Sequence, residues 1–245
     1  MSCTAILVGS GGLPSLTAFD DHECTLATPF GTVLSAPRIG SIKDQQVIAL
    51  ARHGASHSVV PHEVNYRANL WLLKKLGAHR VIATHTVGAI DATLQPSALV
   101  LPEQIIDYTW GRQHSYSGQN DLIHVDFSVP YDRALRHALM SAAAATGVDL
   151  INGGVYGCTQ GPRLETAAEI DRMQRDGCTV VGMTAMPEAA LARELDLPYA
   201  SLCIVVNPAA GRGRIRESID LDALNAARVQ GVAAADRLLV GYFEP

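Results

Sequence analysis

Four residues that could contact a ligand lie between residues 157 and 211. Strand-like apolar runs end in Met183-Thr184 and in Asn207, and Glu165 follows a Gly-Pro turn at the start of a helical pattern. Proteins built from alternating strands and helices bind ligands where polar residues follow apolar strands. These four residues are therefore candidates for one ligand site.

Three further positions have the chemistry of an anion site. Ser10 lies in a glycine-rich turn after an apolar run, where backbone N–H groups can face a negative charge. Arg52 and His53 end a second apolar run, next to a glycine. With Thr184 they supply hydrogen-bond donors and one fixed positive charge, a combination that fits phosphate. Taken singly, a plain tight turn and a surface Arg-His pair remain alternatives.

Other kinds of site have little support in the sequence. The glycine turn matches neither a Walker A loop nor a GxGxxG fingerprint. No candidate nucleophile has a base beside it, so covalent catalysis is not expected. No set of His, Cys and Asp has the spacing of metal ligands, so we expect neither a metal nor an organic cofactor.

Composition favours one soluble globular domain over residues 1–245. The chain of 245 residues has 48% hydrophobic and 18% charged residues, enough for one substantial core. Its formal charge of -5 and pI near 6.0 give no basic surface for nucleic acid or anionic membrane. Five cysteines without CxxC spacing, no apolar run of the ~20 residues that span a membrane, and no signal peptide indicate a cytoplasmic protein.

Hydrophobic periodicity predicts an α/β fold, because strand-like runs alternate with helical patterns. A polar connector over 108–121 is long enough to suggest a role in the site or at an interface. Between 24 and 50 we expect short antiparallel strands. Further strands are expected over 5–8, 80–84, 98–107 with an interruption at Pro102, 150–158, 179–183 and 199–206. Helices are expected over 61–77, 132–146, 165–176, 187–195 and 221–239.

The motifs, in their order and spacing, resemble the trimeric purine nucleoside phosphorylase family, in particular its methylthioadenosine and methylthioinosine phosphorylase branch. The resemblance covers about residues 5–240 and implies a single-domain, three-layer α/β fold with a central mixed sheet flanked by helices. The motifs that carry it are GSGGL (9–13), ARHG (51–54), HEVNYRANLWLLKKLGA (62–78), THTVGAI (84–90), CTQGPRLET (158–166), GMTAMPEAALARE (182–194) and VVNPAAG (205–211).

The resemblance implies a reaction in which phosphate cleaves a purine nucleoside to the free base and a (thio)ribose 1-phosphate. It assigns phosphate binding to Ser10, Arg52, His53 and Thr184, with the backbone around Thr86. It places Met183 against the ribose, and His124 in the sugar site of a neighbouring subunit, so a homotrimer with shared sites is implied. Glu165 and Asn207 would hold the purine.

The residue types favour a 6-oxopurine. Hypoxanthine and guanine carry a hydrogen on N1 that the Glu165 carboxylate can accept, whereas N1 of adenine is itself an acceptor. Asn207 can donate an N–H to N7, where negative charge develops as the base departs. Adenine-specific chains that resemble this one carry Asp at the position of Asn207 and a small residue at that of Glu165. The ARHG and NYRANLW stretches resemble the methylthio branch, and this resemblance makes S-methyl-5′-thioinosine the expected substrate.

Several points stay open in the sequence. General inosine/guanosine phosphorolysis, methylthioadenosine phosphorolysis and a catalytically inactive purine sensor are the alternatives. The roles of His57 at the 5′ end and of residues 209–219 are not set. His85 stands where related chains more usually have Asn or Thr; contact with phosphate or a backbone hydrogen bond would each account for it.

Overall fold

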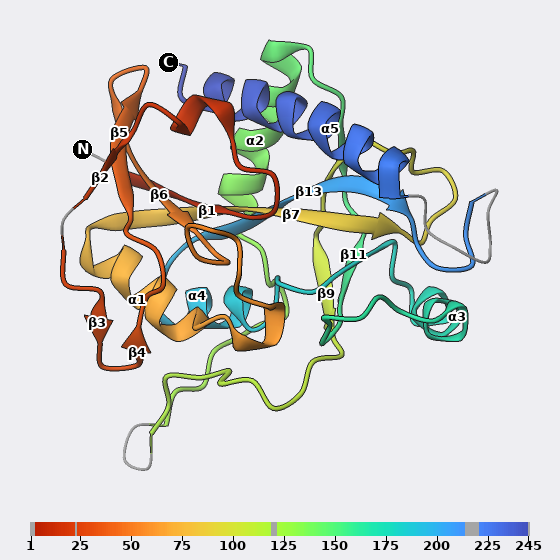
Figure 1. The fold of residues 1–245 in the computed structure, drawn as a ribbon, viewed down its shortest axis with the longest axis horizontal. Helices are drawn as coiled ribbons and strands as arrows, with labels where there is room; N and C mark the ends of the chain where they lie inside the picture. Colours follow the sequence, from red (N-terminus) through yellow and green to blue (C-terminus); the bar gives the residue numbers. More distant parts are fainter. Residues whose placement is uncertain (1–2, 23, 119–121, 214–220, 245) are drawn as a thin grey trace.

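The longest strand, β7 (Ala78–Ala89), connects the two halves of the sheet. It pairs in parallel with β1 (Cys3–Val8) on one side and with β13 (Tyr199–Pro208) on the other. Its last residues also pair antiparallel with β12 (Val180–Gly182). The beginning, middle and end of the chain therefore meet along one strand of the computed structural model (Figure 1).

The remaining strands extend this sheet in both directions. The structure describes residues 3–22, 24–118, 122–213 and 221–244. The other strands are β2 (Asp20–Asp21), β3 (Ala27–Thr28), β4 (Gly31–Thr32), β5 (Arg38–Ile42), β6 (Gln45–Ala51), β8 (Leu99–Leu101), β9 (Gln104–Asp107), β10 (Leu150–Asn152) and β11 (Val155–Cys158). The order is β10-β8-β13-β7-β1-β6-β5-β2, and β12, β11 and β9 branch from the end of β7. Parallel and antiparallel pairs both occur, so the sheet is mixed, as expected.

Helices cover both faces of the sheet. Figure 1 shows α2 and α5 on one face, α1 and α4 on the other, and α3 beyond the carboxyl end of β7. The α-helices are α1 (Tyr66–Lys75), α2 (Arg133–Thr146), α3 (Ala167–Arg175), α4 (Glu188–Glu194) and α5 (Leu221–Tyr242); η1 (Pro14–Leu16) and η2 (Pro61–Glu63) are 3-10 turns. The predicted three-layer α/β arrangement is confirmed.

Each central strand supplies two cores at once. In β1, Ala5 and Leu7 pack with the residues of α1 and α4, whereas Ile6 packs with those of α2 and α5. In β6, Ile48 and Val47 divide in the same way. Side chains alternate between the faces of a strand, so an unbroken apolar run is required where both faces are covered.

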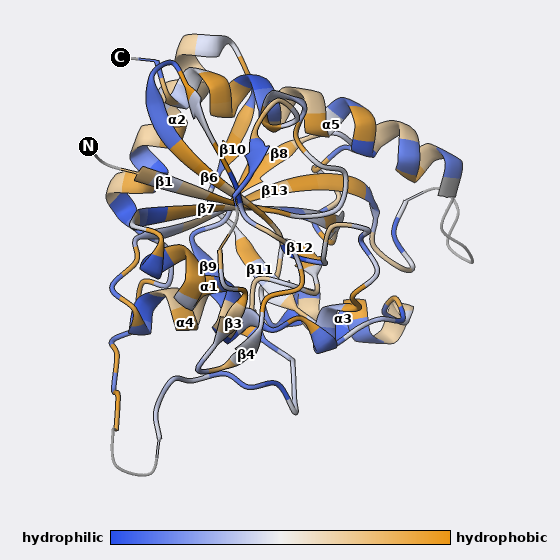
Figure 2. Ribbon diagram, turned by 60° about the vertical axis from the view of Figure 1, so that its left-hand side comes forward, coloured by the Kyte–Doolittle hydropathy of each residue, from blue (hydrophilic) through white to orange (hydrophobic). Residues whose placement is uncertain are grey.

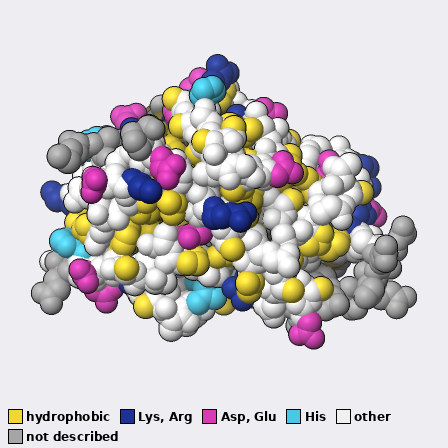
Figure 3. Space-filling model, turned by 90° about the horizontal axis from the view of Figure 1, so that it is seen from above, with side chains coloured by type: hydrophobic (Ala, Val, Ile, Leu, Met, Phe, Trp, Pro, Cys, Tyr) yellow, Lys and Arg dark blue, Asp and Glu magenta, His cyan; other side chains and the backbone are white. Residues whose placement is uncertain are grey.

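The helices are apolar toward the sheet and polar outward (Figure 2). On the face that carries α2 and α5, acidic and basic side chains are interspersed (Figure 3). Among the described residues, no helix combines the length and apolar character needed to cross a membrane.

Two helices begin later than the hydrophobic pattern indicates. The pattern over 61–77 forms the turn η2 and then α1, because the Asn65 side chain caps a backbone N–H in the first turn of α1. Helix α3 begins after Thr166, which forms a capping box with Glu169. Glu165 therefore precedes the helix rather than opening it, and its side chain is not used as a cap.

Two strand predictions were wrong in extent. The strand expected over 80–84 continues through His85 and Thr86, because β13 still pairs with this part of β7. The strand expected over 150–158 is two strands, β10 and β11, because Gly153 and Gly154 adopt φ of +108° and +97° between them.

A buried arginine in the polar connector after β9 ties several loops together. Arg112 Nη1 donates to the carbonyl oxygens of Met183 and Met186 at 2.9 and 2.6 Å. Its Nη2 donates to those of Thr159 and Gln160 at 3.2 and 2.9 Å. The guanidinium thus fixes the backbone after β11 and after β12, where the candidate residues Glu165, Met183 and Thr184 follow. No motif or periodicity in the sequence singles out Arg112 for this role.

Replacing Arg112 by Met should destabilise the protein, because four buried carbonyl groups lose their donor while much of the side-chain volume stays. We expect the free energy of unfolding to fall by about 2–4 kcal/mol. Arg163→Met is the matched control: Arg163 pairs with Glu169 at 2.7 Å on the surface, so its loss should cost less than about 1 kcal/mol. Urea unfolding of both variants measures the difference, and equal losses would contradict the role of Arg112.

Candidate active site

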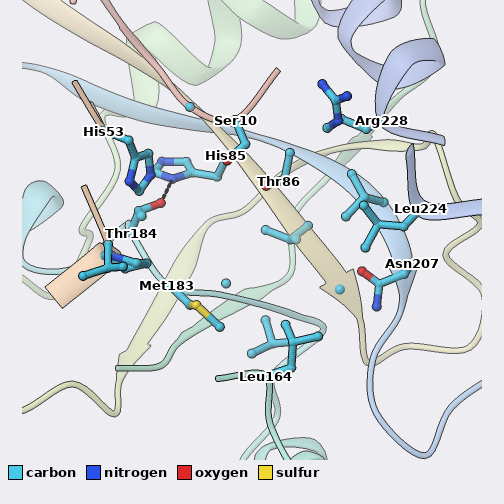
Figure 4. A pocket seen from close by; sticks show the side chains of 18 of the residues that line it. Ser10, His53, His85, Thr86, Leu164, Met183, Thr184, Asn207, Leu224 and Arg228 are labelled. Carbon is cyan, nitrogen blue, oxygen red and sulfur yellow. Dashed lines mark hydrogen bonds between the residues drawn. The ribbon is translucent and has the colours of Figure 1, made fainter. Parts of the chain in front are cut away.

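A cavity of about 410 Å³ opens at the carboxyl ends of β1, β6, β7 and β13. His124 is exposed and does not line it. Figure 4 shows His53, His85 and Thr184 on one side of the cavity and Asn207 and Leu224 on the other. The predicted site residues that line the cavity are Ser10, Arg52, His53, Thr86, Glu165, Met183, Thr184 and Asn207.

The strongest interaction at the site joins Arg52 to Glu188, the first residue of α4. Arg52 Nε and Nη2 donate to the two carboxylate oxygens of Glu188 at 2.7 and 2.8 Å, and Nη1 donates to the Thr84 carbonyl oxygen at 2.9 Å. Both side chains are only 1% exposed. Burial disfavours the charge on Arg52, but the attraction and hydrogen bonds of Glu188 outweigh it and raise the pKa of Arg52. A guanidinium has five N–H groups, so two remain for a ligand.

Gly9 permits this arrangement. A Cβ on Gly9 would lie 2.5 Å from the Thr84 carbonyl oxygen, closer than atoms can pack, and 3.0 Å from Arg52 Nη1, which would have to shift. The Gly9 N–H also donates to Thr84 Oγ1 at 3.0 Å. The glycine-rich turn is therefore required for close approach to the arginine, and it carries Ser10 to the rim of the cavity.

His53 is neutral and has one free ring nitrogen. Its Nδ1 lies 2.7 Å from the Val59 carbonyl oxygen, which can only accept, so Nδ1 carries the hydrogen. Burial lowers the pKa of His53 to about 4; the charges of Arg52 and His57 add to this, and the Val59 hydrogen bond opposes it. His57, at φ +53°, stacks edge-on against His53 and lies 3.1 Å from Ser10 Oγ through its Nε2.

His85 is engaged by side chains on both sides. Its Nδ1 lies 2.8 Å from Thr184 Oγ1 and its Nε2 lies 3.2 Å from the Tyr199 hydroxyl (Figure 4 shows the bond to Thr184). Burial, followed by the charge of Arg52, lowers the pKa of His85 well below its ordinary value. Both its ring nitrogens are therefore occupied within the protein, and neither bonds to backbone, so the backbone alternative was wrong.

Glu165 and Asn207 are held with part of their hydrogen-bonding capacity free. Glu165 Oε1 accepts from the Thr159 hydroxyl at 2.6 Å, which leaves Oε2 for a ligand donor. Asn207 Nδ2 donates one hydrogen to the Pro208 carbonyl oxygen at 2.6 Å, which leaves its second N–H and Oδ1. Together they can bind a planar ring that offers both a donor and an acceptor.

Sequence reasoning missed three residues at the cavity. Glu188 binds Arg52, and Tyr199 contacts His85. The sequence signal for Glu188 was a lone carboxylate inside an apolar run. Arg228, on α5, lines the cavity beside the glycine turn, and no ion pair joins it to another described residue. It gave no signal beyond its place on an amphipathic helix. Residues 214–219 of the expected 209–219 segment lie outside the described part of the chain.

The arrangement can hold an oxyanion beside a polar heterocycle. Ser10, His53 and Thr184 lie along one part of the cavity, and Asn207 faces them across it (Figure 4). Arg52, next to His53 in the sequence, lines the same cavity. Among the residues that the structure describes, no three His, Cys, Asp or Glu side chains come together as metal ligands would. The chemistry that this geometry offers is electrostatic: it places an anion next to a reacting centre and supplies donors where charge develops.

Comparison with known proteins agrees with the motifs. Residues 4–241 match the family described as the phosphorylase superfamily. A probable S-methyl-5′-thioinosine phosphorylase from Xanthomonas campestris pv. campestris is 49% identical over 221 residues, 88% of either chain. The 6-oxopurine nucleoside phosphorylase of Pyrococcus furiosus is 44% identical over 212 residues, 84% of this chain and 79% of that protein.

The fold has close counterparts among solved structures. The methylthioadenosine phosphorylase from Schistosoma mansoni in complex with tubercidin superposes with a TM-score of 0.89 at 29% identity, over 99% of this chain and 90% of that chain. The expected family is confirmed by sequence and by fold. The chain belongs to the phosphorylase superfamily.

Proposed function

We propose that the protein catalyses the phosphorolysis of a 6-oxopurine nucleoside, with S-methyl-5′-thioinosine as its preferred substrate. The products are hypoxanthine and S-methyl-5-thioribose 1-phosphate. The observation that carries this proposal is one cavity in which His53 and Thr184 lie across from Asn207 (Figure 4), and which Arg52 and Glu165 also line.

Phosphate binds at Ser10, Arg52, His53 and Thr184, next to the backbone of Thr86. The sugar lies over Met183, between the phosphate and the base. As the bond to the base breaks, C1′ becomes positive and is stabilised by the adjacent anion, while the free N–H of Asn207 stabilises the negative charge on the purine. A preorganised donor of this kind is worth roughly 10²–10³ in rate.

The identity of the base follows from the acceptor at Glu165. Its free carboxylate oxygen accepts the N1 hydrogen of hypoxanthine, and N1 of adenine would leave it without a donor. Such a mismatch costs about 1–3 kcal/mol. Relatives named as probable S-methyl-5′-thioinosine phosphorylases support the methylthio substituent, since they match at up to 49% identity.

A general 6-oxopurine nucleoside phosphorylase is the second candidate. It is favoured by the polar groups of His57 and Arg228 at the cavity, which could bond to a 5′-hydroxyl group. In both cases inorganic phosphate is a co-substrate, and we propose that no metal or organic cofactor takes part. We place the enzyme in the cytoplasm, where a reduced state suits its five free cysteines.

Phosphate-dependent release of base, measured side by side on three nucleosides, tests the function. We expect kcat/KM to be highest for methylthioinosine, lower for inosine, and at least about tenfold lower for methylthioadenosine, because its N1 cannot donate to Glu165. Fastest turnover of methylthioadenosine would contradict the roles of Glu165 and Asn207. Faster turnover of inosine than of methylthioinosine would favour the second candidate, and turnover of none would favour a purine sensor.

Asn207→Asp should move the preference toward 6-aminopurines. An ionised carboxylate can accept from a 6-amino group but has no hydrogen to donate to a 6-oxo group, whereas the amide can do either, so the ratio of kcat/KM for methylthioinosine over methylthioadenosine should fall by about tenfold or more. Asn152→Asp is the matched control, since Asn152 is exposed on β10 and accepts from Arg136 at 2.6 Å. If Asn207→Asp leaves the ratio unchanged, Asn207 does not read the base.

We propose a homotrimer in which His124 reaches the sugar site of a neighbouring subunit. His124 is exposed and outside the cavity of its own chain, which agrees with a role in another. His124→Ala should raise KM for the nucleoside by about tenfold, because a substrate hydrogen bond is lost. His137→Ala, at an exposed position on α2, is the control. Light scattering should give three times the chain mass; a fully active monomer would contradict shared sites.

A further inference from the structure

A chain of buried hydrogen bonds runs from Glu188 to Thr184. The Tyr199 hydroxyl donates to Glu188 Oε1 at 2.7 Å, and the same hydroxyl lies 3.2 Å from His85 Nε2. His85 Nδ1 lies 2.8 Å from Thr184 Oγ1. All of these residues except Thr184 are 2% exposed or less, and Thr184, at 8%, lines the cavity.

The donor and acceptor of each hydrogen bond in this series are set by the carboxylate at its start. Both carboxylate oxygens of Glu188 accept hydrogen bonds from Arg52, and Oε1 also accepts the single hydroxyl hydrogen of Tyr199. Burial, followed by Glu188, raises the pKa of Tyr199 well above its ordinary value, which keeps that hydrogen in place. The Tyr199 oxygen must then accept from His85 Nε2, which makes Nε2 the protonated nitrogen.

The tautomer of His85 determines how the Thr184 hydroxyl is oriented at the cavity. Neutral His85 with its hydrogen on Nε2 has a lone pair on Nδ1, so Nδ1 accepts the hydroxyl hydrogen of Thr184. Thr184 Oγ1 thus presents only lone pairs to a ligand. His53 Nε2 is likewise a lone pair, since its Nδ1 hydrogen is donated to Val59.

The charges around Arg52 also favour an anion that carries a hydrogen. The charge of Arg52 is balanced by Glu188 at 2.7 Å, and the histidines beside it, His53 and His85, are neutral. Beside Arg52, a fully deprotonated anion would therefore meet two acceptors and a compensated cation. The other arginine that lines the cavity, Arg228, lies on α5 beside the glycine turn. An anion that carries a hydrogen can donate it to one of these acceptors while its other oxygens accept from the free N–H groups of Arg52.

We propose that Thr184 and His53 act as hydrogen-bond acceptors toward the bound anion, so that the site selects a protonated oxyanion and discriminates phosphate from sulfate. His85 and Tyr199 are positioning residues, because they set the orientation of the Thr184 hydroxyl. This inference rests on the proposed use of phosphate. Phosphate keeps at least one hydrogen near neutral pH, whereas sulfate has none to donate.

Calorimetric titration of the full chain with inorganic phosphate and with sulfate, without nucleoside, tests the proposal. We expect sulfate to bind about tenfold more weakly or worse, since each unmatched acceptor carries a penalty of about 1–3 kcal/mol. Equal affinity for the two anions would overturn it. Selective phosphate binding without turnover would contradict the proposed function alone, and turnover with unselective binding would contradict this inference alone.

Tyr199→Phe tests the hydrogen-bond chain. Without the hydroxyl, His85 can place its hydrogen on Nδ1 and donate to Thr184, whose own hydroxyl then turns to the anion. The preference for phosphate over sulfate should fall about fivefold or more, mostly through tighter sulfate binding. Tyr242→Phe is the matched control, because its hydroxyl interacts with Arg80 at 3.1 Å away from the cavity. A folded Tyr199→Phe with the wild-type preference would refute the relay.

The tautomer of His85 gives a readout that does not depend on any variant being stable. Long-range proton–nitrogen correlation spectra of histidine-labelled protein distinguish a protonated Nε2 from a protonated Nδ1, and His85→Asn assigns the signal by its disappearance. If His85→Asn does not fold, spectra near pH 5 still isolate the two buried histidines, because a histidine with the ordinary pKa of about 6.5 is protonated there and burial keeps His53 and His85 neutral. We expect opposite tautomers, His85 with Nε2–H and His53 with Nδ1–H. Two neutral histidines that both carry the hydrogen on Nδ1 at that pH would overturn the proposal.

Discussion

The buried pair of Arg52 and Glu188 is the contact on which the site depends. It joins the end of β6 to the start of α4, and through Thr84 and Tyr199 it also engages β7 and β13. Removing one member of such a pair leaves an uncompensated charge, which costs about 3–5 kcal/mol. Because α4 begins at Glu188, the same contact also sets the position of the loop after β12, which carries Met183 and Thr184.

Most residues that line the cavity could be predicted from the sequence, whereas the buried residues that hold them could not. Ser10, Arg52, Thr184 and Asn207 were recognisable because polar residues at the carboxyl ends of strands are exposed to a shared cavity. Glu188 comes from a segment that reads as an apolar helix, and its partner is 136 residues away. Pairing across that distance depends on how the strands are ordered, which local patterns do not encode.

The fold shows the same division between local and long-range information. The alternation of strands and helices was sufficient to predict a layered α/β structure. The true length of β7 was not predicted, because residues beyond 84 stay extended only while β13 pairs with them. Glu165 was assigned to a helix for a related reason: periodicity continues through it, but the capping box of Thr166 and Glu169 starts the helix after it.

A compensated arginine changes what decides anion binding. A lone guanidinium attracts any anion through its charge, and this attraction depends little on the structure of the anion. When Glu188 balances that charge, the field of Arg52 itself is small, and affinity next to it depends on how well each donor and acceptor is matched. The directed hydrogen bonds from Glu188 to Thr184 then become part of recognition, since they decide which of the groups around Arg52 offers a hydrogen and which offers a lone pair.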